Sequence, residues 1–275
     1  MTDNLISTIG NNIENKIYDE NNIIYVNTNE NLKEVFNNFD VKDKKVLTVL
    51  SSSDQLLSCL YNGAKEVDTF DRSYVTNYYF YLRKWLIEYK NQLYPSNKYL
   101  YDSAYELYKL IFEIKAKTIE ERKARIFWLV YFETNNYKCN KYLFESRYCK
   151  GNTPFEDNID KVREILPKTI NFYGMDIFDE IDLDKTYDII ILSNMLEYET
   201  NNERRNTLRK NLEKLLNNNG IVICSYKTTT KVSNFHLEER DILTKNQLVL
   251  DKEFKYYEPF IGKEKELAYS YKKIS

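Results

Sequence analysis

Small polar and acidic residues follow the first apolar segment of the sequence, where they could contact a ligand. They are Ser51, Ser52, Ser53, Asp54 and Gln55. Small side chains let the backbone approach a ligand closely, and the helix expected after them offers unpaired N–H groups to a carboxylate. Ser53 is also a residue type that caps the start of a helix. The turn therefore predicts a ligand contact, and helix capping explains it about as well.

A single acid, Asp71, ends the second apolar segment. An acid about 20 residues after the first turn of a nucleotide-binding fold accepts hydrogen bonds from both hydroxyls of an adenosine ribose. We therefore expect Asp71 to bind a ribose and Arg72, the next residue, to lie beside the same ligand. The alternative is a charge at the end of a strand with no ligand.

Two further segments end in residues that suit a purine and a reacting group. Met175, Asp176 and Ile177 follow the third segment. The carboxylate of Asp176 could accept the exocyclic amine of adenine, while Met175 or Ile177 packs on the ring. Ser193 and Asn194 follow the fourth segment, and we expect Asn194 to line the floor beneath the reacting group.

Apolar, β-branched runs bounded by turns predict the buried strands of a parallel sheet. These runs span residues 45–50, 66–70, 169–172, 187–192 and 220–226. Helical patterns at 54–61 and 202–216, the latter ended by Asn217 to Gly220, alternate with them. The fold class is therefore α/β, an open and mostly parallel sheet with helices on both faces. Residues 248–257 and 266–272 predict a C-terminal antiparallel hairpin on its edge. Ligands bind at the carboxyl ends of such strands, so the polar residues should converge there.

The interval between Asp71 and Asn171 is too long for one crossover helix. Its middle part is helical in pattern and rich in Tyr, Phe and Trp, which predicts a helical insertion that caps the site; alternatively, these rings fill the insertion's own core. The predicted organisation is an N-terminal segment that could act as a lid, the first half of the α/β domain, the insertion and the second half. The four parts span 1–40, 41–94, 95–167 and 168–275.

Composition excludes several classes of protein. The 40 Lys and Arg residues against 42 Asp and Glu give a net charge of −2, without the basic excess typical of nucleic-acid binding. One histidine and four cysteines without paired spacing predict no metal site and reduced thiols. With no apolar run long enough for a transmembrane segment, we expect a cytoplasmic protein.

The fourth and fifth strands carry a family resemblance. The runs 187–198 and 220–224 resemble two motifs of the Rossmann-like transferases that use S-adenosylmethionine, small-molecule methyltransferases in particular. The resemblance implies S-adenosylmethionine as the cofactor and methyl transfer to a small-molecule or lipid-like acceptor. It points to Asn194 and Tyr198 as candidate catalytic residues, although many members carry His where Tyr198 stands. The residues expected to bind the cofactor are Ser51, Ser52, Ser53, Asp54, Gln55, Asp71, Arg72, Met175, Asp176, Ile177, Ser193 and Asn194.

A narrower resemblance covers Val46 to Tyr89. This segment is similar to diacylglycerol 3-amino-3-carboxypropyl transferases in its Ser-rich turn, the following Asp-Gln pair, the Gly-Ala-Lys step and the acid after strand two. The glycine-rich first motif of methyltransferases is missing. Aminocarboxypropyl transfer is therefore the alternative reaction, and a non-catalytic module that binds the cofactor is a third. The paired prolines of enzymes that methylate nucleic-acid amines are missing after Asn194, so we expect no nucleic-acid partner. The sequence does not predict an oligomeric state.

Overall fold

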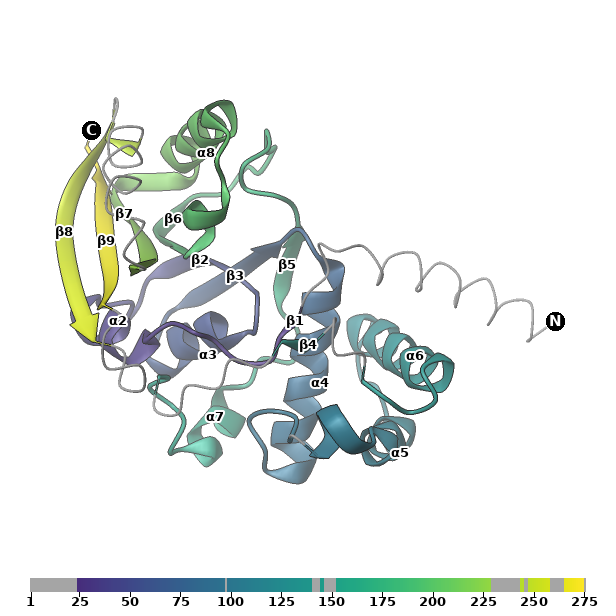
Figure 1. The fold of residues 1–275 in the computed structure, drawn as a ribbon. Helices are drawn as coiled ribbons and strands as arrows, with labels where there is room; N and C mark the ends of the chain where they lie inside the picture. The colour runs from purple at the N-terminus through teal and green to yellow at the C-terminus, as the bar shows by residue number, and fades with distance from the viewer. Residues whose placement is uncertain are drawn as a thin grey trace.

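The computed structural model describes residues 24–96, 98–139, 144–145, 152–228, 243–244, 247–257 and 265–274. A seven-stranded sheet of order β5-β3-β2-β6-β7-β9-β8 forms its centre (Figure 1). Its strands are β2 (Lys45–Val49), β3 (Glu66–Asp71), β5 (Asn171–Gly174), β6 (Tyr187–Ser193), β7 (Leu216–Thr228), β8 (Leu248–Tyr257) and β9 (Lys265–Lys273). The first five run parallel, while β9 pairs antiparallel with β7 and β8. The predicted fold class, a mostly parallel Rossmann-like sheet with a C-terminal hairpin, is confirmed.

Helices cover both faces of the sheet because side chains alternate along each strand. In β6, Ile189 and Ile191 pack with α2 and α3, while Ile190 and Leu192 pack on the opposite face with α8. The helices are α2 (Leu32–Asn38), α3 (Asp54–Tyr61), α4 (Tyr74–Lys90), α5 (Tyr105–Glu113), α6 (Ile119–Thr134), α7 (Ile159–Ile165) and α8 (Asn202–Leu215). In the sheet, β3 and β5 follow β2 on one side, and β6 and β7 lie on its other side. The direction in which strands are added therefore reverses between β2 and β6, and this is the topological switch point.

The described part of the segment 95–167 contains the helices α5, α6 and α7. Helix α6 packs against α4 and α5 packs against α6 (Figure 1), and Trp128 Nε1 donates a hydrogen bond to the backbone oxygen of Tyr78 (2.8 Å). Phe127, Trp128, Tyr131 and Phe132 of α6 are buried in one core with α4. These aromatic side chains therefore fill a core that the segment shares with α4.

Short elements complete the fold. They are the two-stranded pair β1 (Ile24–Tyr25) and β4 (Phe144–Glu145), the π-helical turn η1 (Lys98–Asp102) and the 3-10 turn η2 (Met195–Tyr198). Strand β7 begins at Leu216, so Asn217–Gly220, which we expected to end the helix, belong to the strand. Asn217 is held there because its Nδ2 donates to Asp188 Oδ1 of the neighbouring strand (2.9 Å). Residues 258–264, between β8 and β9, lie outside the described part of the chain.

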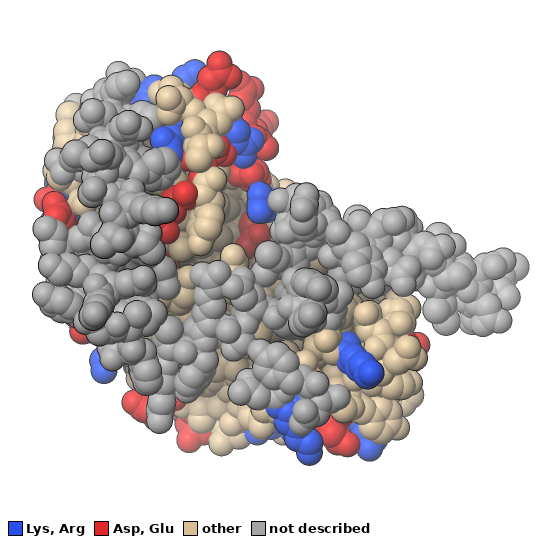
Figure 2. All heavy atoms as spheres, viewed as in Figure 1, with Lys and Arg blue, Asp and Glu red and all other residues tan. Residues whose placement is uncertain are grey.

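Basic and acidic side chains are intermixed over the described part of the face in Figure 2, as the net charge of −2 suggests. Among the described residues, no helix is both long and apolar enough to cross a bilayer.

Candidate functional site

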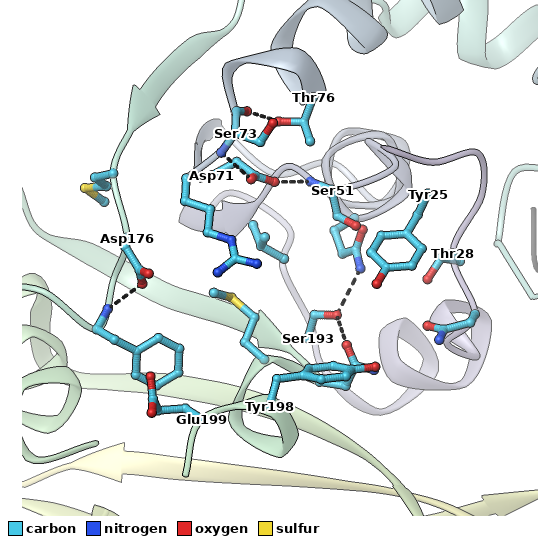
Figure 3. A pocket seen from close by; sticks show the side chains of 18 of the residues that line it. Tyr25, Thr28, Ser51, Asp71, Ser73, Thr76, Asp176, Ser193, Tyr198 and Glu199 are labelled. Carbon is cyan, nitrogen blue, oxygen red and sulfur yellow. Dashed lines mark hydrogen bonds between the residues drawn. The ribbon is translucent and has the colours of Figure 1, made fainter. Parts of the chain in front are cut away.

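A cavity of about 290 Å³ opens at the carboxyl ends of β2, β3, β5 and β6. It therefore lies at the switch point, where open α/β sheets bind ligands. Asp71 and Asp176 both line it, with Asp176 at one side, Asp71 and Ser51 in the middle and Thr28 at the other side (Figure 3). The predicted site residues that line it are Ser51, Gln55, Asp71, Arg72, Met175, Asp176, Ser193, Asn194 and Tyr198.

The serine turn adopts a backbone conformation that normally favours glycine. Ser51 and Ser53 of this turn have φ values of 43° and 71°, in the left-handed region. Ser193, at the end of the neighbouring strand β6, has a φ of 58° in the same region. Such residues cost free energy and are retained mostly at functional sites. Ser53 is the N-cap residue of α3, as predicted, but its side chain makes no capping bond, and Ser52 Oγ instead accepts from Asp54 N (3.4 Å).

Ser53→Gly should raise the free energy of unfolding by about 1 kcal/mol. Glycine removes the left-handed penalty, and it removes a buried hydroxyl that makes no hydrogen bond with the described residues. Urea denaturation measures the change. Ser53→Ala is the matched control, because it removes the hydroxyl and keeps the strained Cβ. If the two variants were equally stable, the backbone would not be strained.

Asp71 keeps both carboxylate oxygens available to a ligand. Its Oδ1 accepts from Ser73 N (2.9 Å) and its Oδ2 from Ser51 N (3.0 Å). Each oxygen has two lone pairs, so each can accept one more donor. Burial raises the pKa of Asp71 to about 6, and the two backbone N–H groups oppose that rise. The geometry suits a pair of adjacent hydroxyls.

Asp176 is paired with an arginine that the sequence argument missed. Its Oδ2 lies 2.9 Å from Arg204 Nη2, and its Oδ1 accepts from Phe178 N (3.0 Å). Arg204 also pairs with Asp179 and with Glu199, and its hydrogen bond lowers the pKa of the Glu199 carboxyl. These contacts fix Asp176 at the edge of the cavity. Only the alternation of charge along α8 signals Arg204 in the sequence, and any exposed helix shows it.

Met175 and Phe178 line the cavity, but Ile177 does not. Ile177 is fully buried and packs in the core with Leu208, Leu212 and Leu215 of α8. Phe178 stands where we expected Ile177 to supply an apolar wall for a purine. The expected contact by Ile177 therefore fails, and Phe178 is the better candidate.

Ser52, Ser53 and Asp54 also lie outside the cavity lining. Asp54 is fully buried and pairs with Arg83 of α4, whose Nη1 lies 2.9 Å from Asp54 Oδ1. Tyr94 Oη donates to the same oxygen (3.0 Å). These bonds direct the Asp54 carboxylate toward the protein interior and away from the cavity. Its expected role as a cofactor contact is replaced by a structural one.

The N-terminal segment forms one wall of the cavity. Its lining residues are Tyr25, Asn27, Thr28 and Asn29. Thr28 N donates to Asp54 Oδ2 (2.5 Å), and Tyr79 Oη of α4 donates to the backbone oxygen of Val26 (2.7 Å). Among the described residues of 95–167, none lines the cavity. The capping role of that segment stays a prediction, whereas the segment expected as a lid does border the cavity.

The two candidate catalytic residues lie together at the end of β6. Ser193 Oγ donates to Asn194 Oδ1 (3.4 Å), and Asn194 Nδ2 donates to Tyr198 Oη (3.4 Å). Tyr198 is 65% exposed and borders the cavity. Because its oxygen accepts from Asn194, its own O–H is free to point at an acceptor molecule.

No family model and no curated protein matches the chain. Among solved structures, the N-methyltransferase NodS from Bradyrhizobium japonicum WM9 in complex with S-adenosyl-L-homocysteine is 10% identical, with a TM-score of 0.44 over 96% of this chain and 98% of that one. An S-adenosylmethionine-dependent methyltransferase from Clostridium acetobutylicum ATCC 824 is 10% identical, with a TM-score of 0.45 over 89% and 90%. A putative S-adenosylmethionine-dependent methyltransferase from Listeria monocytogenes is 11% identical, with a TM-score of 0.44 over 89% and 98%. Likenesses at these identities concern the fold alone.

Proposed function

We propose that the cavity binds S-adenosylmethionine and that the chain transfers its methyl group to a small-molecule or lipid-like acceptor. One observation carries the proposal: Asp71 and Asp176 line a single cavity together with the Ser51 turn and the tip of β6. That arrangement offers hydrogen-bond acceptors for a ribose and a purine in the order in which an adenosine carries them.

The residues fit the cofactor as follows. The spare lone pairs of Asp71 accept the two ribose hydroxyls, and Asp176 accepts the adenine amine between Met175 and Phe178. Arg72 lies beside the ribose on the cavity rim. The remaining end of the cavity, which includes Gln55, receives the methionine chain. At about 290 Å³ the cavity has the volume of a small-molecule site.

The chain's own residues contribute mainly by positioning. When bound, the cofactor supplies a methyl group on a positively charged sulfur, which is already activated for transfer. Holding an acceptor in line with that bond supplies most of the acceleration. Asn194 fixes the hydroxyl of Tyr198 at the mouth of the cavity, so this pair orients the acceptor.

The proposal is tested by incubating the protein with labelled S-adenosylmethionine and candidate acceptors, small amines and lipids among them. S-adenosylhomocysteine as the product supports methyl transfer. Methylthioadenosine above the level in an enzyme-free control would instead indicate aminocarboxypropyl transfer. A protein that binds the cofactor and forms neither product with any acceptor would be a binding module.

Cofactor binding should weaken about tenfold when the pH falls from 7 to 5. The pKa of Asp71 is raised to about 6 in the free protein, so its carboxyl is protonated below that pH. Ribose hydroxyls donate to the charged form, and binding therefore requires loss of that proton. Calorimetric titration with S-adenosylhomocysteine across this pH range measures the effect. Asp71→Asn is the control and should bind with little pH dependence; an equal dependence in this variant would assign the titration to another group.

A further inference from the structure

The side chain of Gln55 has a fixed orientation beside the cavity. It is 2% exposed and belongs to the first turn of α3. Its Nε2 donates to Glu30 Oε2 (2.8 Å) and, over a longer distance, to Ser193 Oγ (3.4 Å). The Glu30 oxygen accepts this bond, so Glu30 holds the amide nitrogen toward itself. The carbonyl oxygen of Gln55 must then face the other way.

Among the described residues, that carbonyl oxygen has no hydrogen-bond partner. Gln55 Oε1 is buried and accepts no hydrogen bond from the residues that the structure describes. A buried acceptor without a donor costs free energy, which a donor on a ligand would recover. Because Gln55 lines the cavity, a ligand bound there can supply such a donor.

The charges around this end of the cavity favour a cationic donor. Asn27, Thr28 and Ser193, which line it with Gln55, are all uncharged. Glu30, 1% exposed, stands behind the amide and makes its carbonyl oxygen a stronger acceptor. Within the described lining the two cations are Arg72, next to Asp71, and Arg204, which is paired with Asp176.

We propose that Gln55, oriented by Glu30, binds the ammonium group at the amino-acid end of S-adenosylmethionine. The inference rests on the proposed function, which directs the methionine chain toward this end of the cavity. Glu30 acts through Gln55 and is a positioning residue. The pair would make the site selective for ligands that carry the amino group.

The test compares three ligands by isothermal titration calorimetry. They are S-adenosylhomocysteine, its analogue with hydrogen in place of the amino group, and methylthioadenosine, which lacks the amino-acid end. The wild-type chain should prefer S-adenosylhomocysteine to the deaminated analogue by roughly tenfold to a hundredfold, the usual worth of a charged hydrogen bond. Gln55→Met should abolish this preference and keep the affinity for methylthioadenosine.

Two further variants separate orientation from folding. Glu30→Gln keeps the shape of the side chain but can also donate, so Gln55 is no longer held one way and the preference should shrink. Asp71→Ala should weaken all three ligands together and leave the preference intact. Because Glu30→Gln is nearly isosteric, it carries the test if Gln55→Met does not fold, as judged by circular dichroism.

The outcomes are distinct. A preference that survives in both Gln55→Met and Glu30→Gln, with methylthioadenosine still bound, would overturn this inference and leave the proposed function standing. Failure of the wild-type chain to bind any of the three ligands would overturn the proposed function and the inference with it.

Discussion

Replacing Asp71 with Ala should weaken the binding of S-adenosylhomocysteine by roughly tenfold to a hundredfold. The carboxylate accepts from Ser51 N and Ser73 N, and its remaining lone pairs are the acceptors for the ribose. A hydrogen bond to a charged group is worth about 1.5–3 kcal/mol, and the alanine side chain can make none. Calorimetric titration at pH 7.5, where the carboxylate is ionised, measures the loss.

The control is an acid in a similar setting away from the cavity. Asp188 of β6 accepts from the backbone N–H of Lys45 (2.9 Å) and does not line the cavity. Asp188→Ala should therefore reduce stability and leave affinity unchanged. If folded Asp71→Ala bound as tightly as the wild-type chain, the ribose would lie elsewhere.

Replacing Arg83 with Met should lower the free energy of unfolding by about 3–5 kcal/mol, because it leaves the Asp54 carboxylate buried without its partner. The two side chains are 1% and 0% exposed, and their atoms lie 2.9 Å apart. Arg83 Nε also donates to the backbone oxygen of Leu93 (3.0 Å), and its guanidinium lies 4.5 Å from the centre of the Tyr94 ring. For a chain of this size the thermal midpoint should fall by roughly 6–20 °C.

An exposed ion pair provides the matched control for this loss. Lys109 and Glu106 are 49% and 53% exposed, so Lys109→Met should cost less than about 1 kcal/mol. The double variant Arg83→Met with Asp54→Asn should be more stable than Arg83→Met alone, since no buried charge is then left unpaired. A loss below 1 kcal/mol in the single variant would mean that Asp54 is not buried as described.

The sheet and the aspartates could be predicted because local patterns determine them. Buried parallel strands are continuous apolar runs, and the residue that ends each run reaches the ligand-binding edge whatever the rest of the chain does. Asp71 ends β3 and Asp176 follows the end of β5 by two residues, and both line the cavity. Each strand of the C-terminal hairpin was likewise evident from its own residues.

The serine turn shows where sequence reasoning stops. Within five consecutive polar residues, Ser51 and Gln55 face the cavity while Asp54 turns inward to Arg83. Asp54 turns inward because it pairs with Arg83, 29 positions further along the chain. No local sequence pattern encodes this contact. The same holds for the wall that includes Thr28, because its tether to Asp54 is a contact between distant segments.

The N-terminal wall makes its contacts to Asp54 and Tyr79 through backbone atoms. The bonds to Asp54 and Tyr79 come from the amide of Thr28 and the carbonyl of Val26, so they do not depend on which side chains the neighbouring positions carry. Asn29, which is partly exposed, can therefore change identity over evolutionary time while the wall keeps its course, with proline at 28 as the plain exception since it lacks the amide hydrogen. Relatives could diverge in what they admit to the cavity by altering this side chain, and laboratory libraries aimed at new acceptors would sensibly begin there.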